Sequence, residues 1–354
     1  MQLSSVLLAT VLSAAMTLFS VACAEDSRVQ VAFDALLVDG IATDLNGSGV
    51  TPLSAELSFS TLVPTSVEWE VLGPLPAMGT ADLSSEHSIP VVGLYPGTEN
   101  QVLVRLTDAE QRFAVDTVVI ATDPLPEFFP EIDIVVADLD RMEPGWTLSS
   151  YQSIGEEGTY RSRPFIFDTN GDVRWTMDLS FFGGLAYMIE RFENGNLLFG
   201  FGEAVFEYDL LGRELRRWDI SGYSYHHEVI EKPDGNLLVA VSKIAEPETV
   251  NDRVIELDRN SGAIVREWDL RRVLDVSRRD FRGDDTNWLH NNGIWYDSED
   301  DALIVSGRQQ GAVVKVSRDN ELVWILAPHR GWGPAGINGN GPNTSEFLLT
   351  AVDG

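Results

Sequence analysis

The segment ELDRNSGAIVREW, residues 256–268, decides the fold, because its form returns three more times along the chain. The other copies are FDTNGDVRW from residue 167, EYDLLGRELRRW from residue 207 and KVSRDNELVWI from residue 315. Each copy is a short apolar strand, a polar or glycine-containing turn, and a second strand with an aromatic residue at or near its end. Asn, Asp and Gly tolerate the positive φ angles that tight hairpin turns require. The four segments therefore predict four β-hairpins of one kind.

Four tryptophans and a second repeated element give these hairpins a period. The tryptophans are spaced by 43, 50 and 56 residues, at Trp175, Trp218, Trp268 and Trp324. Between them NGNLLFGF, DGNLLVAV and DDALIVSG recur, from residues 194, 234 and 300. Two hairpins per period of about 40–55 residues are typical of four-stranded β-propeller blades. We predict an all-β fold in which residues 126–354 form about four blades. A second sandwich is the weaker alternative, because it would not repeat this regularly.

Residues 28–125 predict a separate β-sandwich domain. AELSFST, SVEWEVL, HSIPVVGL, NQVLVRLTD and RFAVDTVVIATD are short runs rich in Val, Leu and Thr, separated by turn residues, as in a sandwich. The run GLYPGTENQVLVRL, residues 93–106, resembles the Leu-x-Pro corner of fibronectin-type sandwiches. Three prolines in TDPLPEFFPEI then mark a boundary between the two domains.

Composition limits the possible partners. The 354 residues are enough for about two domains, and a hydrophobic content of 44% can fill a large core. With 55 acidic and 25 basic residues the net charge is −30, which repels nucleic acid and anionic lipid. We therefore expect no nucleic-acid partner. An anionic substrate would need a local basic site.

Residues 1–24 are uncharged, apolar and end in small residues, which predicts a secretory signal. Two processing sites compete there. A cut after Ala24 fits an A-x-A motif, whereas Ser20–Cys23 is close to a bacterial lipobox that would place a lipid on Cys23. Cys23 is the only cysteine, so the mature chain is expected to have neither a disulfide nor a thiol nucleophile. We predict a periplasmic or extracytoplasmic location, with anchoring to the outer membrane as a lipoprotein left open. No later segment approaches the ~20 apolar residues of a membrane span.

Three histidines stand at corresponding places in neighbouring repeats. His226 and His227 lie in YSYHHEVIEKPDGNLLV, and His290 lies in NWLHNNGIWYDSEDDALIV, 64 residues after His226. Each group precedes an apolar strand, an acidic turn and a second strand. Since the first strand of a blade lines the central channel, we expect these side chains to meet at one channel mouth. His87, in the sandwich, is expected at the surface or at a corner.

Arg308 follows the second strand, in IVSGRQQGAVVKV, and in an acidic protein it needs an anionic partner. Its planar fork fits a sulfate, phosphate or carboxylate. Neutral donors could be added by Asn291, Asn292, Gln309 and Gln310. The alternatives are an internal ion pair for Arg308 and purely structural histidines. A zinc site is a further interpretation, but no ligand spacing such as H-x-x-x-H supports it, and we predict no metal. No phosphate loop, G-x-S-x-G elbow or PAPS-binding motif is present.

Several of these motifs together resemble a known family. HHE followed by KPDGNLLV, the stretch NWLHNNGIWYDSEDDALIVSGRQQGAVVKV, and LVWILAPHRGW are similar to the bacterial arylsulfotransferases that do not use PAPS, the aryl-sulfate sulfotransferases. NGSGVTPLSAELSFST, HSIPVVGLYPGTENQV and IATDPLP resemble the N-terminal region of that family. The resemblance covers residues 45–354 in the right order.

The resemblance implies an Ig- or fibronectin-like sandwich followed by a six-bladed propeller. It implies transfer of a sulfuryl group from a phenolic sulfate ester to an acceptor phenol through a sulfohistidine, without a cofactor. Arg308 matches the sulfate-clamping arginine of the family, and His290 matches a histidine that stabilises the transferring group. His227, beside Glu228, matches another catalytic histidine, suited to hydrogen bonding or to protonating the phenolate oxygen. His226 and Asn292 are expected to contact the substrate.

One departure from the family pattern concerns the nucleophile. In the family the attacking histidine lies in a Gln-His motif after the stretch that EFLLTAVDG matches, and no Gln-His pair occurs in this chain. His329, in APHRGW, belongs to a different motif. We therefore expect the propeller to be incomplete at its C-terminal side, with the nucleophile beyond Gly354. The alternatives are an inactive propeller module that binds a sulfated or anionic ligand, and a partly folded remnant. A homodimer and a lipid anchor both stay open.

Overall fold

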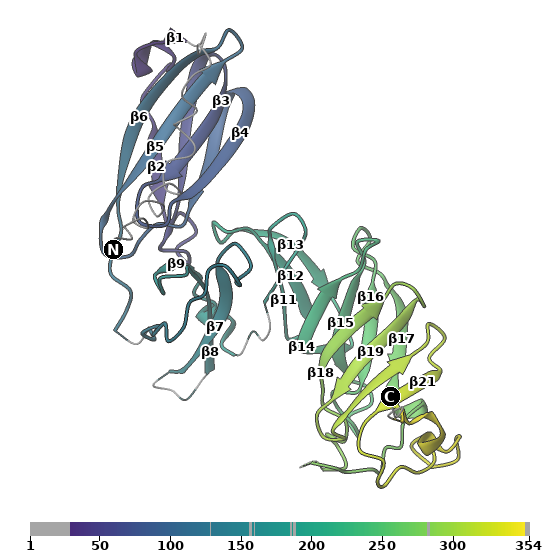
Figure 1. Cartoon of the computed structure of the whole chain (residues 1–354). Coiled ribbons are helices and arrows are strands. Elements are labelled where there is room, and N and C mark those ends of the chain that lie inside the picture. The colour runs from purple at the N-terminus through teal and green to yellow at the C-terminus, as the bar shows by residue number, and fades with distance from the viewer. Residues whose placement is uncertain are drawn as a thin grey trace, which may run out of the picture.

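The computed structural model describes residues 29–127, 129–155, 158, 160–184, 186, 189–281 and 284–350. The expected signal segment, residues 1–24, and Cys23 lie outside these residues. In the described part there is no α-helix, and the only helical turns are four short 3-10 segments: η1 (Phe33–Ala35), η2 (Ser180–Phe182), η3 (Leu270–Arg272) and η4 (Thr344–Phe347). None of the described helices has the length and apolar character to cross a bilayer. The predicted all-β fold is confirmed (Figure 1).

The N-terminal domain is one six-stranded sheet that turns from one layer into a second. Its strands are β1 (Val29–Gln30), β2 (Ala42–Leu45), β3 (Ser54–Val71), β4 (Ala77–Val92), β5 (Glu99–Asp108) and β6 (Arg112–Ala121). The order is β1-β6-β5-β3-β2, with β4 also paired to β3. All pairs are antiparallel except β1 with β6.

The long strand β3 differs from the prediction, which divided it into two short strands. Its first half pairs with β2 at residues 55–58, and its second half pairs with β5 at residues 65–71. The register with β4 shifts between Ser60 and Val67. The strand therefore bends there and contributes to both layers. Polar residues and Pro64 between the two apolar runs resemble a turn in sequence, although here they form the bend.

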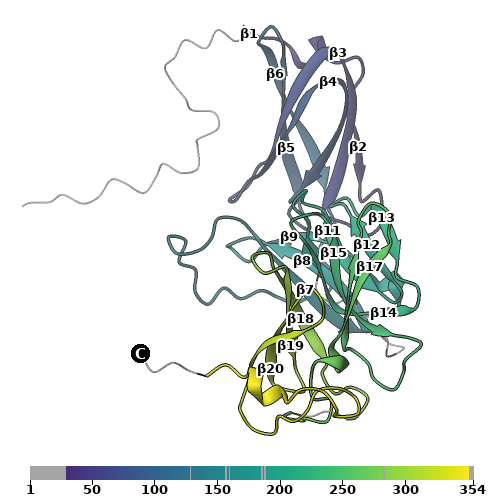
Figure 2. The ribbon, with the colours of Figure 1, turned by 90° about the vertical axis from the view of Figure 1, so that its right-hand side faces the viewer.

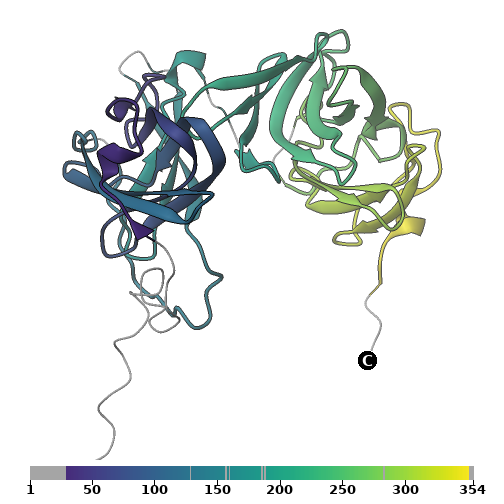
Figure 3. The same ribbon diagram turned by 90° about the horizontal axis from the view of Figure 1, so that it is seen from above.

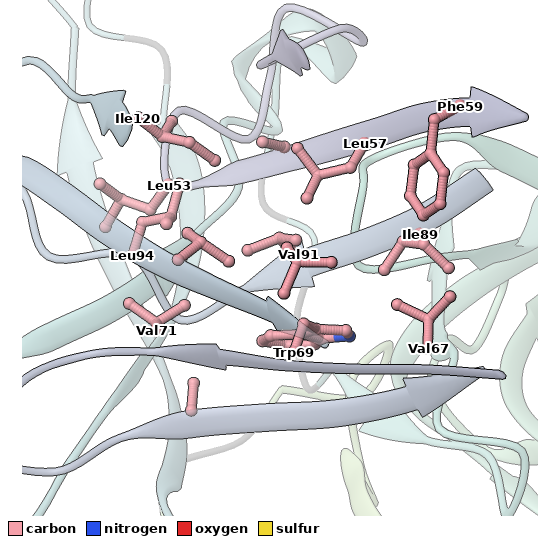
Figure 4. Close-up of a cluster of buried hydrophobic side chains, with 14 of the residues drawn as sticks. Leu53, Leu57, Phe59, Val67, Trp69, Val71, Ile89, Val91, Leu94 and Ile120 are labelled. Carbon is pink, nitrogen blue, oxygen red and sulfur yellow. The ribbon is translucent and has the colours of Figure 1, made fainter. Parts of the chain in front are cut away.

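The sandwich core lies between these two layers. Leu57 from the first half of β3 and Val67 from the second half belong to the same buried cluster as Val91 of β4, and all three are almost fully buried. Figure 4 shows these side chains converging from different strands. Burial alternates along β3 with a period of two, which is what a strand with one face on a core requires. Each such buried aliphatic side chain contributes about 1.5–3 kcal/mol.

His87 corrects one prediction, because it is buried rather than at the surface. It lies in β4 on the inward face and is only 6% exposed. Its Nε2 is 3.1 Å from Thr65 Oγ1, and its ring stacks on Phe59 with 4.7 Å between centroids. Burial lowers the pKa of His87 below its usual value. The side chain is thus part of the sandwich core.

The C-terminal part is a series of antiparallel sheets, which we call blades 1 to 4. They comprise β7 (Thr147–Ile154), β8 (Tyr160–Phe167) and β9 (Val173–Thr176) in blade 1; β10 (Glu190–Arg191), β11 (Leu197–Phe201), β12 (Ala204–Tyr208) and β13 (Glu214–Asp219) in blade 2; β14 (Tyr223–Glu231), β15 (Leu237–Lys243), β16 (Arg253–Leu257) and β17 (Ile264–Asp269) in blade 3; and β18 (Asn291–Asp297), β19 (Ala302–Gly307), β20 (Ala312–Val316) and β21 (Leu322–Leu326) in blade 4. Strands pair in sequence order within each blade. This confirms the predicted propeller blades.

The blades follow one another from the base of the sandwich toward the C-terminal end (Figure 1). Figure 2 shows the sandwich standing above the blades, with β8 and β9 near its base. Seen from above, the sandwich and blade 4 lie at opposite ends (Figure 3). Blades 2, 3 and 4 touch through β11, β14 and β18. No pairing joins β7–β9 to β18–β21 within the residues that the structure describes.

Consecutive blades are joined by hydrogen bonds from their tryptophans. The three bonds run from Trp175 Nε1 to Leu210 O (2.7 Å), from Trp218 Nε1 to Arg259 O (2.8 Å) and from Trp268 Nε1 to Ser317 O (2.9 Å). In each case the donor is in the last strand of one blade, and the acceptor lies in the final hairpin turn of the next blade. A buried indole needs such a partner. The repeated tryptophan is therefore the link between blades.

The final hairpin turns present these carbonyls because one residue in each adopts a left-handed conformation. These residues are Gly171, Gly212, Gly262 and Asn320, with φ angles of 85°, 78°, 74° and 61°. Asn is among the residue types that tolerate this region, so it can replace the glycine in blade 4. The turn chemistry inferred from the sequence is confirmed.

A buried arginine joins blade 1 to the sandwich. Arg174 of β9 is fully buried and donates to Gly93 O at 2.6 Å and to Leu75 O at 2.7 Å, both in the sandwich. It also pairs with Asp168 at 2.9 Å and lies over the Tyr95 ring at 3.6 Å. Because its charge and its donors are satisfied across the boundary, the two parts are held together.

The tryptophan links predict a specific loss of stability. Replacing Trp218 by Phe keeps an aromatic ring but leaves Arg259 O without its donor and opens a cavity, so the free energy of unfolding should fall by about 2–4 kcal/mol. The matched control is Trp324→Phe, because the half-buried Trp324 indole has no such partner among the described residues. That change should cost less than about 1 kcal/mol. Urea unfolding measures both, and equal losses would contradict the role of the bond.

Candidate active site

The histidines of blade 3 are aimed by a β-bulge. The pairing of β14 with β15 shifts register between Tyr225 and Val229, which places His226 and His227 in the irregular part of the strand. His227 has φ of 60°, in the left-handed region. A bulge redirects side chains that a regular strand would point along the sheet normal. The local backbone thus turns both rings toward the neighbouring blade.

His290 repeats this conformation in blade 4. It directly precedes β18, whose pairing with β19 shifts between Asn291 and Gly293. Its φ is 54°, again left-handed. Such a conformation costs a non-glycine residue of order 1–3 kcal/mol and persists where the surroundings enforce it. Corresponding strain at His227 and His290 marks both places as functional candidates.

The three imidazoles meet, as the sequence predicts. Ring centroids are 4.2 Å apart for His226 and His227, 4.8 Å for His226 and His290, and 5.4 Å for His227 and His290. One ring nitrogen from each residue lies within 4.8 Å of the others. We call these three residues the histidine cluster. Their catalytic roles stay predictions.

Two neighbouring residues hold the cluster in place. Tyr225 donates its hydroxyl to His227 O at 2.7 Å, and its ring lies over Gly200 of β11, where a Cβ would be 2.1 Å from a ring carbon. Glu228, which follows His227, accepts a hydrogen bond from the backbone N–H of Ile294 in β18. Burial raises the pKa of Glu228. Glycine at position 200 and the carboxylate of Glu228 therefore fix blade 3 against blades 2 and 4 at the site.

Arg308 lies beside His290 and has an exposed side chain. Its backbone N–H donates to His290 O at 3.1 Å, while the next N–H, of Gln309, donates to Leu289 O at 3.0 Å. Its guanidinium has no hydrogen bond or ion pair with any residue in the described ranges. Among the described residues, Arg308 therefore does not form the internal ion pair that the sequence left open as an alternative. The cation is available to a ligand.

The electrostatics of the site follow from burial and from this cation. Burial, and next the neighbouring His227 and His290, lower the pKa of His226 to about 3. Burial, then His290 and Arg308, lower the pKa of His227 to about 4. Burial and then Arg308 also lower the pKa of His290. At neutral pH the three histidines are therefore uncharged. The positive charge of the site comes from Arg308.

The cluster suits an anion better than a metal ion. Three histidines are a common ligand set for Zn²⁺, but tetrahedral bonds of about 2.0–2.1 Å place ligand nitrogens about 3.4 Å apart. Here the nitrogens spread over up to 4.8 Å. A dication would also be repelled by Arg308, which is close enough to affect two of the histidines. Neutral N–H groups around a guanidinium instead match the oxygens of a sulfate or phosphate group.

The neutral side chains expected to help Arg308 divide into two groups. Asn291 donates to Arg253 O at 3.0 Å, and Gln310 donates to Asp275 O at 2.6 Å, so their amide nitrogens support backbone, while their side-chain oxygens are buried without a partner within the described structure. Asn292 is half-buried, and its buried Oδ1 lacks a hydrogen-bond partner within the described structure. Gln309 Oε1 is also buried without such a partner. Outside the cluster, exposed His329 has Nε2 at 2.9 Å from Leu349 O.

Sequence reasoning missed the residues behind His290. Its Nδ1 is 2.8 Å from Asn287 Nδ2, and Asn251 Nδ2 donates to Asn287 Oδ1 at 3.2 Å. Ser242 then donates to Asn251 Oδ1 at 2.9 Å. The spacing of Asn287, three residues before His290, was the available signal. Asn251 is far away in sequence and gives none.

The fold and the site define a class of protein: an Ig-like β-domain followed by propeller blades, with three histidines and an exposed arginine gathered where two blades meet. Comparison with family models agrees. The model described as arylsulfotransferase (ASST) matches residues 131–353, and the arylsulfotransferase Ig-like domain matches residues 42–123. The first match covers more than half of the chain. The chain belongs to the arylsulfotransferase family.

Two relatives described as arylsulfate sulfotransferases are longer than this chain. The arylsulfate sulfotransferase AssT of Escherichia coli O6:H1 is 31% identical over 222 residues, covering 48% of this chain and 37% of that protein. AssT of Lelliottia amnigena is 25% identical over 344 residues, covering 72% of this chain and 57% of that protein. The chain thus spans only about half the length of these relatives.

Among solved structures, a Bacteroides caccae protein of unknown function aligns with 75% of this chain and 94% of its own length. The identity is 13% and the TM-score is 0.35. At that level of similarity the alignment does not bear on the activity.

The lowered pKa values of the cluster predict acid sensitivity. Between about pH 6.5 and 4 an unfolded histidine binds a proton that the folded cluster does not, so the free energy of unfolding falls as pH falls. For His226 the loss from pH 7.5 to 5 should be about 1–2 kcal/mol. His226→Gln should flatten the pH dependence of the urea midpoint, whereas His329→Gln, at an exposed residue, should not. Parallel curves for wild type and His226→Gln would refute this.

Proposed function

We propose that this chain carries the sulfate-binding part of a site that transfers a sulfuryl group from a phenolic sulfate ester to an acceptor phenol. The observation that carries the proposal is the exposed guanidinium of Arg308, which pairs with none of the described residues and lies beside three uncharged histidines. In a protein with a net charge of −30, a cation left open in this way has a ligand as its natural partner. Membership of the arylsulfotransferase family supports sulfate as that ligand.

In this proposal Arg308 binds two sulfuryl oxygens with its planar fork. Transfer at sulfur resembles phosphoryl transfer, in which the entering and leaving oxygens are in line and the equatorial oxygens carry the charge. Arg308 neutralises that charge, and N–H groups of the histidine cluster add hydrogen bonds. Asn292 and His226 are proposed to contact the ester.

His227 is proposed to assist the leaving phenolate. Without ligand its imidazole is neutral, because its pKa is lowered to about 4 by burial and by the neighbouring charges. A bound sulfate ester brings negative charge, which opposes the influence of Arg308 and favours a proton on His227. The residue can then donate a hydrogen bond or a proton to the departing oxygen.

The finer proposal is a sulfohistidine intermediate. A histidine nitrogen attacks sulfur, the bond from sulfur to the aryl oxygen breaks, and the phenolate leaves with the electron pair. The acceptor phenol then loses its proton, its oxygen attacks sulfur, and the bond from nitrogen to sulfur breaks. The attacking histidine is not one of the cluster in this proposal. In line with the resemblance, we propose that it belongs to a Gln-His motif, which does not occur among residues 1–354.

A non-catalytic module that binds a sulfated or anionic ligand is the second candidate. It is supported by the arrangement of Arg308 and the histidine cluster, which would suffice to bind an anion without any residue acting as a nucleophile. Neither candidate function specifies the donor phenol or the acceptor phenol, and neither requires a homodimer.

The test compares Arg308→Ala with Arg318→Ala, an exposed arginine in the final turn of the same blade that pairs with Asp301. Phenyl sulfate should stabilise wild type and Arg318→Ala against heat, and should bind Arg308→Ala at least about 100-fold more weakly. With a fluorogenic aryl sulfate and a second phenol, transfer should fall in parallel. Absence of phenyl sulfate binding to wild type would sink both candidates.

Turnover separates the two candidates. Binding without acceptor-dependent release from this chain favours the module, and release that requires the acceptor favours the transferase. Mass spectrometry after quenching with base detects an acid-labile sulfuryl group on histidine. A sulfuryl group on His226, His227 or His290 would contradict the finer proposal, since it assigns the attack elsewhere.

We also propose that the protein acts in the periplasm or another extracytoplasmic compartment, and that Cys23 is a site of lipidation. The support is the apolar, uncharged segment of residues 1–24, in which Cys23 is the second-last residue. Full-length protein should then sediment with bacterial membranes, and Cys23→Ser should shift it to the soluble fraction. Soluble wild-type protein would count against the anchor.

A further inference from the structure

We propose that Asn287 is a positioning residue that sets the tautomer of His290, so that His290 offers an Nε2–H donor and not a lone pair to the bound group. The inference rests on the proposed function for what that group is. It assigns a role within the site to three residues, Ser242, Asn251 and Asn287, that lie in blade 3 and the segment leading to blade 4.

The first step is the orientation of the Asn251 amide. The backbone N–H of Asn251 donates to Ser242 Oγ at 2.9 Å, so the hydroxyl oxygen already accepts there. The hydroxyl proton is free to be donated to Asn251 Oδ1, also at 2.9 Å. This assignment turns the amide oxygen toward Ser242 and the amide nitrogen away from it. The nitrogen then faces Asn287.

The second step passes this orientation to Asn287. Asn251 Nδ2 donates to Asn287 Oδ1 at 3.2 Å, which makes that oxygen the acceptor side of the second amide. Asn287 Nδ2, which can only donate, is 2.8 Å from His290 Nδ1. His290 Nδ1 must therefore accept, and it carries a lone pair.

A competing contact exists and is weaker. Asn287 Oδ1 is 3.1 Å from His290 Nδ1, so an Nδ1–H could in principle donate to it. That arrangement would set the Nδ1–H against the N–H of the closer amide nitrogen, at 2.8 Å. It would also compete with Asn251 for the same oxygen. The shorter contact and the relay from Ser242 favour the accepting form of Nδ1.

The consequence lies on the other side of the ring. A neutral imidazole has one N–H, so acceptance at Nδ1 places the proton on Nε2. His290 sits beside Arg308, whose N–H bonds to its carbonyl. An Nε2–H next to the guanidinium adds a donor for a sulfuryl oxygen. The same tautomer deprives His290 of the lone pair that a nucleophile or general base would need at Nε2.

The backbone keeps this relay in place. Asn251 has φ of 58°, left-handed like His227 and His290, and its carbonyl accepts from the N–H of Asn291 at 3.0 Å. Asn251 therefore bonds to Asn287 through its side chain, and through its backbone to Asn291, the residue after His290. Blade 3 thereby controls a ring that belongs to blade 4.

The test reads the tautomer directly by nitrogen-15 NMR of protein labelled in its histidine rings. The chain has five histidines, and His290→Gln identifies the signals of His290. Without ligand, at pH 7.5, wild type should show His290 protonated at Nε2 and unprotonated at Nδ1. Asn287→Asp replaces the donor by a carboxylate of the same shape, so it should move the proton to Nδ1 or charge the ring. A wild-type ring protonated at Nδ1 would overturn the proposal without any variant.

Binding supplies the second readout. Asn287→Asp should weaken phenyl sulfate binding about tenfold or more, because a donor is lost and a negative charge is added. Asn287→Ser, which keeps a small donor, should restore part of the Nε2–H signal and part of the affinity. Unchanged affinity in Asn287→Asp with a reversed tautomer would also overturn the assigned role. If wild type has the expected tautomer but binds no phenyl sulfate, the proposed function fails and the positioning by Asn287 stands.

Discussion

The hydrogen bond from a buried indole to a turn carbonyl of the next blade is the interaction on which the propeller part depends. It occurs at three successive junctions, with lengths between 2.7 and 2.9 Å. An indole N–H buried without a partner would destabilise each junction, so the bond fixes how far one blade is displaced against its neighbour. The active-site candidates are a consequence, because the histidines in β14 and directly before β18 meet only if blades 3 and 4 keep this register. The repeated tryptophan bonds, which stabilise each junction, thus bring the histidines of two blades to one place.

Charge organises that site as much as shape does. The protein is strongly acidic overall, yet the candidate site holds three uncharged imidazoles and one exposed guanidinium. Two buried arginines are neutralised by neighbouring carboxylates. Arg253 is paired with Asp252 and Asp269, and Arg174 is paired with Asp168. Arg308 stands apart from these because no described carboxylate reaches it. Close to this residue a positive charge therefore opposes the repulsion of anions by the acidic surface.

Much of this architecture could be predicted from the sequence, because it depends on patterns with a period. The tryptophan-terminated hairpins identified the blades, and equal placement of His226 and His290 within their repeats predicted their contact. Features without a period were missed. The bend inside β3 has the sequence of a turn, and the inward face of His87 depends on the register of β4. The relay behind His290 joins residues 48 positions apart, from Ser242 to His290, and only the folded loops bring them together.

Three residues at the site, His227, Asn251 and His290, have backbone angles that glycine would adopt at less cost. Folding imposes these conformations before any ligand arrives, so the conformational entropy of aligning the rings is lost at that stage and not during association. A mouth built in this way is preorganised, and its geometry should persist when it is empty. Mutation has a corresponding asymmetry. Glycine at these positions would relieve backbone strain and gain stability, but it would remove the side chains that form the candidate site, so stability and the proposed function oppose each other here.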